Sequence, residues 1–291
     1  MTDHLSPDEG FTDSYTPPEL PAEEIPLARP VVFPESAPTT QTGHEILLLS
    51  ASRLDVLADL FVVVLFVVGM DVLVRLVLSF LVISPELPLG TDLPEIEQAL
   101  FPPMLAIRTI LVIVAVAAIL RHRKQGTDSI GVSRIALRLN AAIGIVAILA
   151  TALLIFMWQM VMLTVWPGLL EQMGENADRI MALVPRLHPL GFVGVSLAVA
   201  VYEEVLFRGF LLTRLRRATG SWTIAVVVST AVFTLLHSID QTPAAMAPIT
   251  ILALSFCLTT IWRRSIIPAI VGHFFFDLYQ FVVLFFFVEQ M

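Results

Sequence analysis

Two neighbouring glutamates and an arginine lie inside an otherwise apolar stretch of the chain. Glu203 and Glu204 follow a run of apolar residues, and Arg208 comes one helical turn after Glu204. A charge at the centre of a bilayer costs about 2.5–3.5 kcal/mol on insertion scales, so each of these groups needs a role that offsets it. Successive helical residues are about 100° apart, so we expect the two carboxylates to point in different directions and Arg208 to neutralise Glu204. Glu203 is then left to face a cavity as a general base or a metal ligand.

Two further apolar stretches each carry a histidine. Phe233 precedes His237 by one helical turn and can pack against its ring. His273 precedes Asp277 by the same spacing, so Asp277 can accept a hydrogen bond from one ring nitrogen and fix the tautomer. A single histidine of this kind is more often a hydrogen-bonded core residue, but two of them together with two glutamates favour one shared site.

One carboxylate and two imidazoles suit the hydrolysis of an amide. Glu203 can take a proton from water while His237 and His273 stabilise the developing oxyanion. The same three residues could instead bind Zn²⁺, leaving the fourth position for water and Glu204 as the base. The sequence leaves both mechanisms open, and it also leaves a structural alternative in which the glutamates and Arg208 only join helices. The HExxH, GxSG and GxGD signatures of other intramembrane proteases are absent.

The elements that must position these residues are membrane-spanning helices. The chain has 291 residues, of which 57% are hydrophobic and 14% charged, and its mean hydropathy is +0.85. A helix needs about 20 apolar residues to cross a bilayer. We therefore predict an all-α integral membrane protein of about seven transmembrane helices. The expected spans are 56–83, 104–120, 141–166, 190–212, 222–236, 246–262 and 266–288. The single Cys257 excludes an intramolecular disulfide.

The composition divides the chain into three parts. Residues 1–50 are rich in proline and hold nine of the 25 acidic residues, which predicts a disordered, acidic cytoplasmic tail. No signal peptide is expected at the first residue. Residues 51–189 are expected to form three transmembrane helices with their loops, and residues 190–291 a core of four.

The distribution of Lys and Arg predicts the orientation of the chain. With the tail inside, twelve of the 17 basic residues fall in cytoplasmic segments and only Arg179 and Arg186 fall on the other side. We therefore predict a cytoplasmic N-terminus, an external C-terminus and a multi-pass location in a cell membrane, expected to be a bacterial inner membrane. Asp71 and Arg75, one turn apart in the first span, are expected to neutralise each other.

The three motifs together resemble those of a known family. In order and spacing they are similar to the EExxxR, FxxxH and HxxxN motifs of the CPBP family, the CAAX protease and bacteriocin-processing intramembrane proteases. This family includes the type II CAAX prenyl endopeptidases and the bacterial Abi proteins. The resemblance covers residues 190–288. It implies that Glu203 activates water and that Glu204 and Arg208 support it.

The resemblance also implies that His237, His273 and Asp277 complete the catalytic site. Asp277 stands where the family more usually has Asn, and an ionised Asp can only accept hydrogen bonds. It therefore fits orienting His273 or binding a metal better than stabilising an oxyanion. Both a metalloprotease and a metal-free glutamate mechanism are considered for the family, so the resemblance leaves Zn²⁺ open.

The resulting hypothesis is a membrane-embedded endopeptidase that cleaves near the membrane surface. Its expected partners are the lipid bilayer and a membrane-associated protein or peptide, either a CAAX-type C-terminus or a bacteriocin-like peptide, with no nucleic acid and an open oligomeric state. One alternative is a catalytically silent membrane binding or immunity protein of the same fold. Another is a proton-coupled transporter, which predicts inverted repeats that the sequence does not show.

Overall fold

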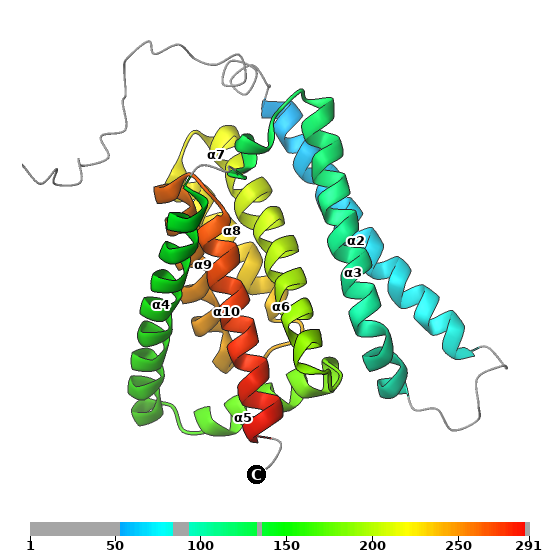
Figure 1. Ribbon diagram of the computed structural model, residues 1–291, viewed down its shortest axis with the longest axis vertical. Coiled ribbons are helices and arrows are strands. Elements are labelled where there is room, and N and C mark those ends of the chain that lie inside the picture. Colours follow the sequence, from blue (N-terminus) through cyan, green and yellow to red (C-terminus); the bar gives the residue numbers. More distant parts are fainter. Residues whose placement is uncertain (1–52, 84–92, 133–135, 289–291) are drawn as a thin grey trace, which may run out of the picture. The chain divides into compact units, whose positions relative to one another are not determined.

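The computed structural model describes residues 53–83, 93–132 and 136–288, all within the unit Gln41–Met291. This part of the chain is helical and contains no strand, which confirms the predicted all-α class. The long helices (Figure 1) are α2 (Arg53–Ile83), α3 (Leu93–His122), α4 (Leu137–Val165), α5 (Leu169–Leu183), α6 (Pro189–Glu204), α7 (Leu212–Thr219), α8 (Trp222–His237), α9 (Pro243–Arg263) and α10 (Ile267–Val283). Three short segments are the 3₁₀ helix η1 (Thr127–Ile130) and the π-helical turns η2 (Val205–Leu211) and η3 (Leu284–Val288).

Five helical stretches of the described chain are long and apolar enough to cross a membrane. They are Gln98–His122, Leu137–Val165, Pro189–Thr219, Pro243–Arg263 and Ile267–Phe286. The predicted span 222–236 corresponds to α8, which is apolar but has only 16 residues. At about 1.5 Å per residue it is shorter than a ~30 Å hydrocarbon core. The predicted span 56–83 lies within α2, and the side chains of the predicted pair Asp71 and Arg75 lie outside the described part.

Helix α5 lies within residues 167–189, which we predicted to be only a connection between two spans. Gly168 enters it with φ 89°, a left-handed conformation that glycine adopts without strain. The helix is too polar to span a bilayer, and its Leu169 is buried. Its Asn176 Oδ1 accepts a hydrogen bond from the Thr242 amide at 2.9 Å. Thus α5 closes one end of the bundle and fixes the connection between α8 and α9.

Helix α10, which carries two of the predicted site residues, packs against α4, α6 and α9. Its contact with α4 is close, since a Cβ added to Gly144 would lie 2.5 Å from the carbonyl oxygen of Pro268. Gly272 meets the same seam, where a Cβ would lie 3.3 Å from the carbonyl oxygen of Gly144. Small residues at this seam therefore allow the backbones to approach and set the depth of His273, the next residue on α10.

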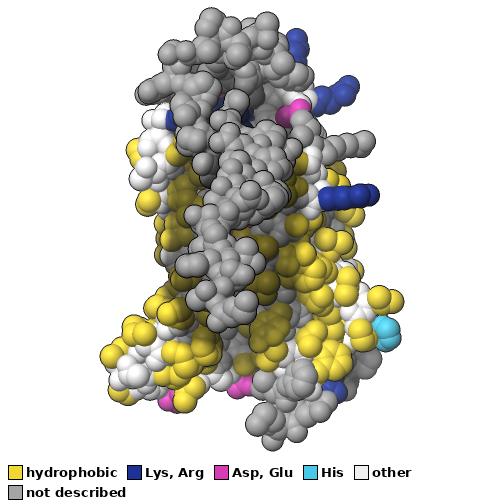
Figure 2. Space-filling model, turned by 60° about the vertical axis from the view of Figure 1, so that its left-hand side comes forward, with side chains coloured by type: hydrophobic (Ala, Val, Ile, Leu, Met, Phe, Trp, Pro, Cys, Tyr) yellow, Lys and Arg dark blue, Asp and Glu magenta, His cyan; other side chains and the backbone are white. Residues whose placement is uncertain are grey.

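Charged residues gather where α2 begins, directly after α3 ends and in the first turn of α7. We call Asp55, Asp59, Arg123 and Arg214 the terminal cluster. Arg123 donates to both acids, and Arg214 Nε lies 3.5 Å from Asp59 Oδ2. On the face shown in Figure 2, hydrophobic side chains cover a broad band and most of the Lys and Arg side chains in view lie towards one end. The beginning of α2, the end of α3 and the beginning of α7 therefore lie close together.

Candidate active site

The end of helix α6 and the following turn bring two acids and one arginine together. Arg208 Nη1 donates to Glu204 Oε1 at 2.8 Å, with both side chains at most 1% exposed. This contact confirms the pairing that the spacing predicted. Arg208 Nη2 also donates to the carbonyl oxygen of Ala253 on α9 at 3.3 Å. Its guanidinium carbon lies 4.4 Å from the ring centroid of Phe233 and 5.3 Å from that of Phe256, so two aromatic faces enclose the cation.

Arg208 does not lie on a continuous α-helix, which we expected over residues 190–212. Residues Val205–Leu211 form a π-helical turn between α6 and α7. Such turns widen the helix and frequently occur at functional sites. Segment η1 packs closely here, since a Cβ added to Gly209 would lie 3.1 Å from the carbonyl oxygen of Ile130. The widened turn and this close contact together place Arg208 inside the bundle.

Both glutamates meet the ring of His273, which α10 brings in from the other side. His273 is 4% exposed, and its Nδ1 donates to Glu204 Oε1 at 2.8 Å. Its Nε2 lies 3.8 Å from Glu203 Oε2. We expected the two carboxylates to point in different directions. They lie beside the two nitrogens of one imidazole, which are on different edges of the ring, and only Glu204 is at hydrogen-bond distance.

Asp277 lies farther from His273 than the sequence analysis expected of a tautomer-fixing partner. Its Oδ2 is 3.5 Å from Nε2, beyond the usual hydrogen-bond range, whereas Glu204 is at 2.8 Å from Nδ1. Glu204 is therefore the residue that holds the His273 ring. Asp277 places a carboxyl group beside Nε2.

His237 is connected to this group through an aromatic ring. Its Nδ1 lies 2.9 Å from the carbonyl oxygen of Phe233, and because a carbonyl can only accept, Nδ1 carries the proton. Its ring packs on Phe233 at 4.4 Å between centroids, as the spacing predicted. The Phe233 ring also lies 6.5 Å from the ring of His273. When the ring of His237 is neutral, Nε2 is therefore the nitrogen that can accept a hydrogen bond.

The predicted zinc ligands Glu203, His237 and His273 do not form a metal site in this arrangement. Within the described residues, no three His, Cys, Asp or Glu side chains are grouped so that they could hold a metal ion. The Phe233 ring contacts both histidine rings, and the Nδ1 of His273 is occupied by Glu204. These residues as placed do not fit a metal ion, so no step of the chemistry below passes through one.

Two aromatic residues of the site were missed in the sequence. Phe256 stacks on His273 at 5.5 Å between ring centroids, and Tyr202 donates from its hydroxyl to Glu203 Oε1 at 2.7 Å. Phe256 lies on α9, which has no charged motif, so nothing distinguished it among 19 phenylalanines. Tyr202 had a signal, since it directly precedes the two glutamates. Within the described part of the chain, Glu203 Oε2, Glu204 Oε2 and Arg208 Nε are buried without a hydrogen-bond partner.

A comparison with known families identifies this part of the chain. Residues 185–279 match the family model described as type II CAAX prenyl endopeptidase Rce1-like. The matched segment contains all six predicted site residues. The result confirms the family that the three motifs predicted. No curated protein and no solved structure matched the chain.

Proposed function

We propose, from the finding that residues 185–279 are an Rce1-like domain of the type II CAAX prenyl endopeptidase family, that this membrane protein is an intramembrane endopeptidase whose water is activated by Glu203. One observation carries the proposal. Glu203 Oε2 is buried and has no hydrogen-bond partner among the residues that the structure describes, yet it lies 3.8 Å from Nε2 of His273. A carboxylate oxygen kept in this state can accept a proton from a water molecule held beside it.

The residues divide the reaction between them. Glu203 takes a proton from water as the water oxygen forms a bond to the peptide carbonyl carbon. His273, held by Glu204 at Nδ1, presents Nε2 towards the developing oxyanion, and a protonated Nε2 can donate to it. When the carbon–nitrogen bond breaks, the proton on Glu203 passes to the departing amine. The chain thus needs no nucleophilic serine or cysteine.

Arg208 allows Glu203 to act as the base because it neutralises the neighbouring Glu204. Two carboxylates at depth repel each other, and the ion pair with Arg208 offsets the charge of Glu204. The enclosing Phe233 and Phe256 rings exclude water from the pair and stabilise the cation. The charge that remains for chemistry is that of Glu203.

The substrate that the family name supports is a membrane-associated protein with a prenylated CAAX C-terminus, and a bacteriocin-like peptide is the second class. The twelve basic residues in the segments predicted to be cytoplasmic support a cytoplasmic N-terminus and a location in a cell membrane.

The proposal is tested by purified protein in detergent. Wild type and Glu203→Ala are compared on a quenched peptide library containing prenylated and unmodified members, with and without a zinc chelator. We expect cleavage by wild type and none by Glu203→Ala. The preferred members identify the substrate class, and the chelator arm tests the requirement for a metal.

A catalytically silent binding or immunity protein is the competing function. An ion-pair network that only joins helices is expected to satisfy its buried oxygens, because buried polar groups nearly always have partners. Two unpartnered carboxylate oxygens in one site argue against that function. Folded wild-type protein that cleaves no member of the library would support it.

A further inference from the structure

Tyr202 holds one oxygen of the proposed base. Its side chain is buried at 7% exposure, and its hydroxyl donates to Glu203 Oε1 at 2.7 Å. The second oxygen of Glu203 is the unpartnered Oε2 that faces His273. Because the two oxygens of a carboxylate are rigidly joined, fixing Oε1 also fixes the direction of Oε2.

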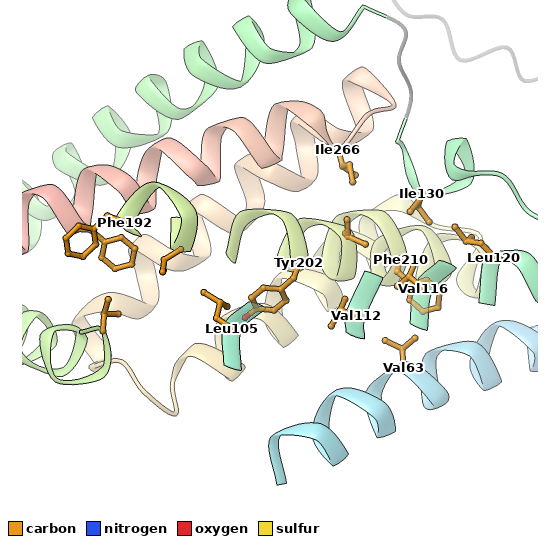
Figure 3. Packing of buried hydrophobic residues seen from close by; sticks show 14 of the residues in the cluster. Val63, Leu105, Val112, Val116, Leu120, Ile130, Phe192, Tyr202, Phe210 and Ile266 are labelled. Atoms are coloured by element: carbon orange, nitrogen blue, oxygen red, sulfur yellow. The ribbon is translucent and has the colours of Figure 1, made fainter. Parts of the chain in front are cut away.

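The ring of Tyr202 is held from α3. It belongs to the same buried hydrophobic cluster as Leu105 and Val112 of that helix, and Figure 3 shows the ring beside Leu105. The guanidinium carbon of Arg108 lies 5.0 Å from the centre of the ring. Thr109 Oγ1 donates to the carbonyl oxygen of Leu105 on its own helix at 2.8 Å, and the carbonyl oxygen of Ala198 on α6 lies 3.4 Å from the same hydroxyl. Helix α3 lies outside the segment 185–279 that matches the family model.

We infer that Tyr202 is a positioning residue for Glu203 and that α3, through Arg108, holds Tyr202 in place for it. This inference rests on the proposed function. A hydrogen bond to an ionised acceptor is short and strong, and a cation over a tyrosine ring keeps the ring in one position. Without the hydroxyl, the glutamate side chain regains rotamers, and a displacement of about 1 Å at a reacting atom can cost about 10²-fold in rate.

A packing role alone would require only the ring of Tyr202. Phenylalanine has the same ring and lacks only the hydroxyl, so Tyr202→Phe separates the two roles. The chain supplies a matched control in Tyr279→Phe, since Tyr279 is 67% exposed on α10. We expect Tyr202→Phe to lower kcat by about 10- to 100-fold with KM within about twofold, and Tyr279→Phe to change neither. Arg108→Met is expected to lower kcat in the same direction by about threefold.

The same change made in the Glu203→Gln background tests whether Tyr202 acts through Glu203. A positioning role predicts that Tyr202→Phe then causes no further loss, because the two residues act as a unit. Equal kcat for Tyr202→Phe and Tyr279→Phe overturns the inference, as does an equal fractional loss in both backgrounds. An unchanged kcat in Arg108→Met overturns the part assigned to α3.

A spectroscopic measurement reads the contact without activity. The infrared difference between wild type and Tyr202→Phe is expected to show a shifted carboxylate stretching band, which is absent when the same difference is taken in the Glu203→Gln background. No band shift overturns the inference. If wild type cleaves nothing while the band shifts, the proposed function fails and the contact between Tyr202 and Glu203 stands.

Discussion

Two groups of acids and arginines in the described part of this protein differ in how their acids are held. In the site, the unpaired buried atoms of the acids are the Oε2 oxygens of Glu203 and Glu204. Guanidinium nitrogens without a hydrogen bond occur in both groups: Nε of Arg208 in the site, and Nε and Nη1 of Arg214 in the terminal cluster, where Nε lies 3.5 Å from Asp59 Oδ2. A guanidinium stays protonated at any ordinary pH, whereas a carboxylate can gain and lose a proton. Under the proposed function, the same residue types therefore serve acid–base chemistry in the first group and only attraction in the second.

The acids of the terminal cluster are well satisfied by comparison. Arg123 donates from Nε and Nη2 to Asp59 Oδ1 at 3.0 and 2.8 Å, and from Nη1 to Asp55 Oδ1 at 2.9 Å. Arg214 donates to Gln125 Oε1 at 2.7 Å. These bonds join the first two helices to α7. Under the proposed function, the number of donors that each acid receives, more than its burial, distinguishes the acids of the site from those of the terminal cluster.

The largest expected effect is a loss of activity when Glu203 is replaced, since its Oε2 has no hydrogen-bond partner among the described residues. Glu203→Gln should lower kcat by about 10³-fold, because the amide cannot accept the proton from water. The thermal midpoint of unfolding should change by less than about 2 °C, because the Glu203 carboxylate forms no ion pair at hydrogen-bond distance in the site. Peptide cleavage and thermal unfolding in the same detergent provide the measurement. A large loss of stability would indicate that Glu203 has a structural role, as Asp55 and Asp59 have.

The next effect is on stability, from the buried ion pair. Arg208→Met should lower the free energy of unfolding by about 3–5 kcal/mol, because it leaves Glu204 buried and uncompensated. Denaturant unfolding in mixed micelles measures the loss. The control is the double variant Arg208→Met with Glu204→Gln, which should recover part of it because no charge is left unpaired. A double variant as unstable as Arg208→Met would contradict this explanation.

A smaller effect is expected in the terminal cluster. Arg123→Met should cost about 1–2 kcal/mol of unfolding free energy, because the Arg123 side chain is 21% exposed and Asp59 keeps Arg214 as a partner. The kcat should remain within about twofold of wild type. Both are measured under the conditions used for Arg208→Met. A loss of activity as large as that of Glu203→Gln would remove the distinction between the two groups.

The smallest effect is expected from a zinc chelator. The described site residues do not form a group of three metal ligands, so prolonged dialysis against the chelator should change kcat by less than about twofold. Cleavage rates before and after dialysis measure this. A loss that added Zn²⁺ restores would show that Glu203, His237 and His273 move together to bind it.

The sequence predicted the contacts that lie within one helix. The pairing of Glu204 with Arg208 and the packing of Phe233 on His237 follow from a spacing of four residues, which places side chains on one face. The hydrogen bond from His273 to Glu204 joins residues on two helices, and no local pattern determines which helix faces which. The sequence therefore named the residues of the site but assigned the holding of His273 to Asp277, its neighbour on the same helix.

Two features of the backbone were also beyond local patterns. Helix α5 is polar enough to resemble a connection, and its contacts with Thr242 and Ala244 become visible only when α9 is in place. The turn Val205–Leu211 has an apolar sequence that suits an α-helix equally well. Tertiary packing against η1 and α9, more than local propensity, distinguishes the two.

The π-helical turn at Val205–Leu211 determines how α7 is rotated about its axis relative to α6. A turn of this kind contains one residue more than an α-helical turn, so α7 is rotated relative to a continuous extension of α6. Deleting one residue within it would restore the α register and swing Arg214 by about 100° away from Asp59 and Gln125. The extra residue of this turn therefore affects the orientation of both Arg208 in the site and Arg214 in the terminal cluster. In an alignment with a relative whose helix is continuous, it would appear as a single-residue gap beside Arg208.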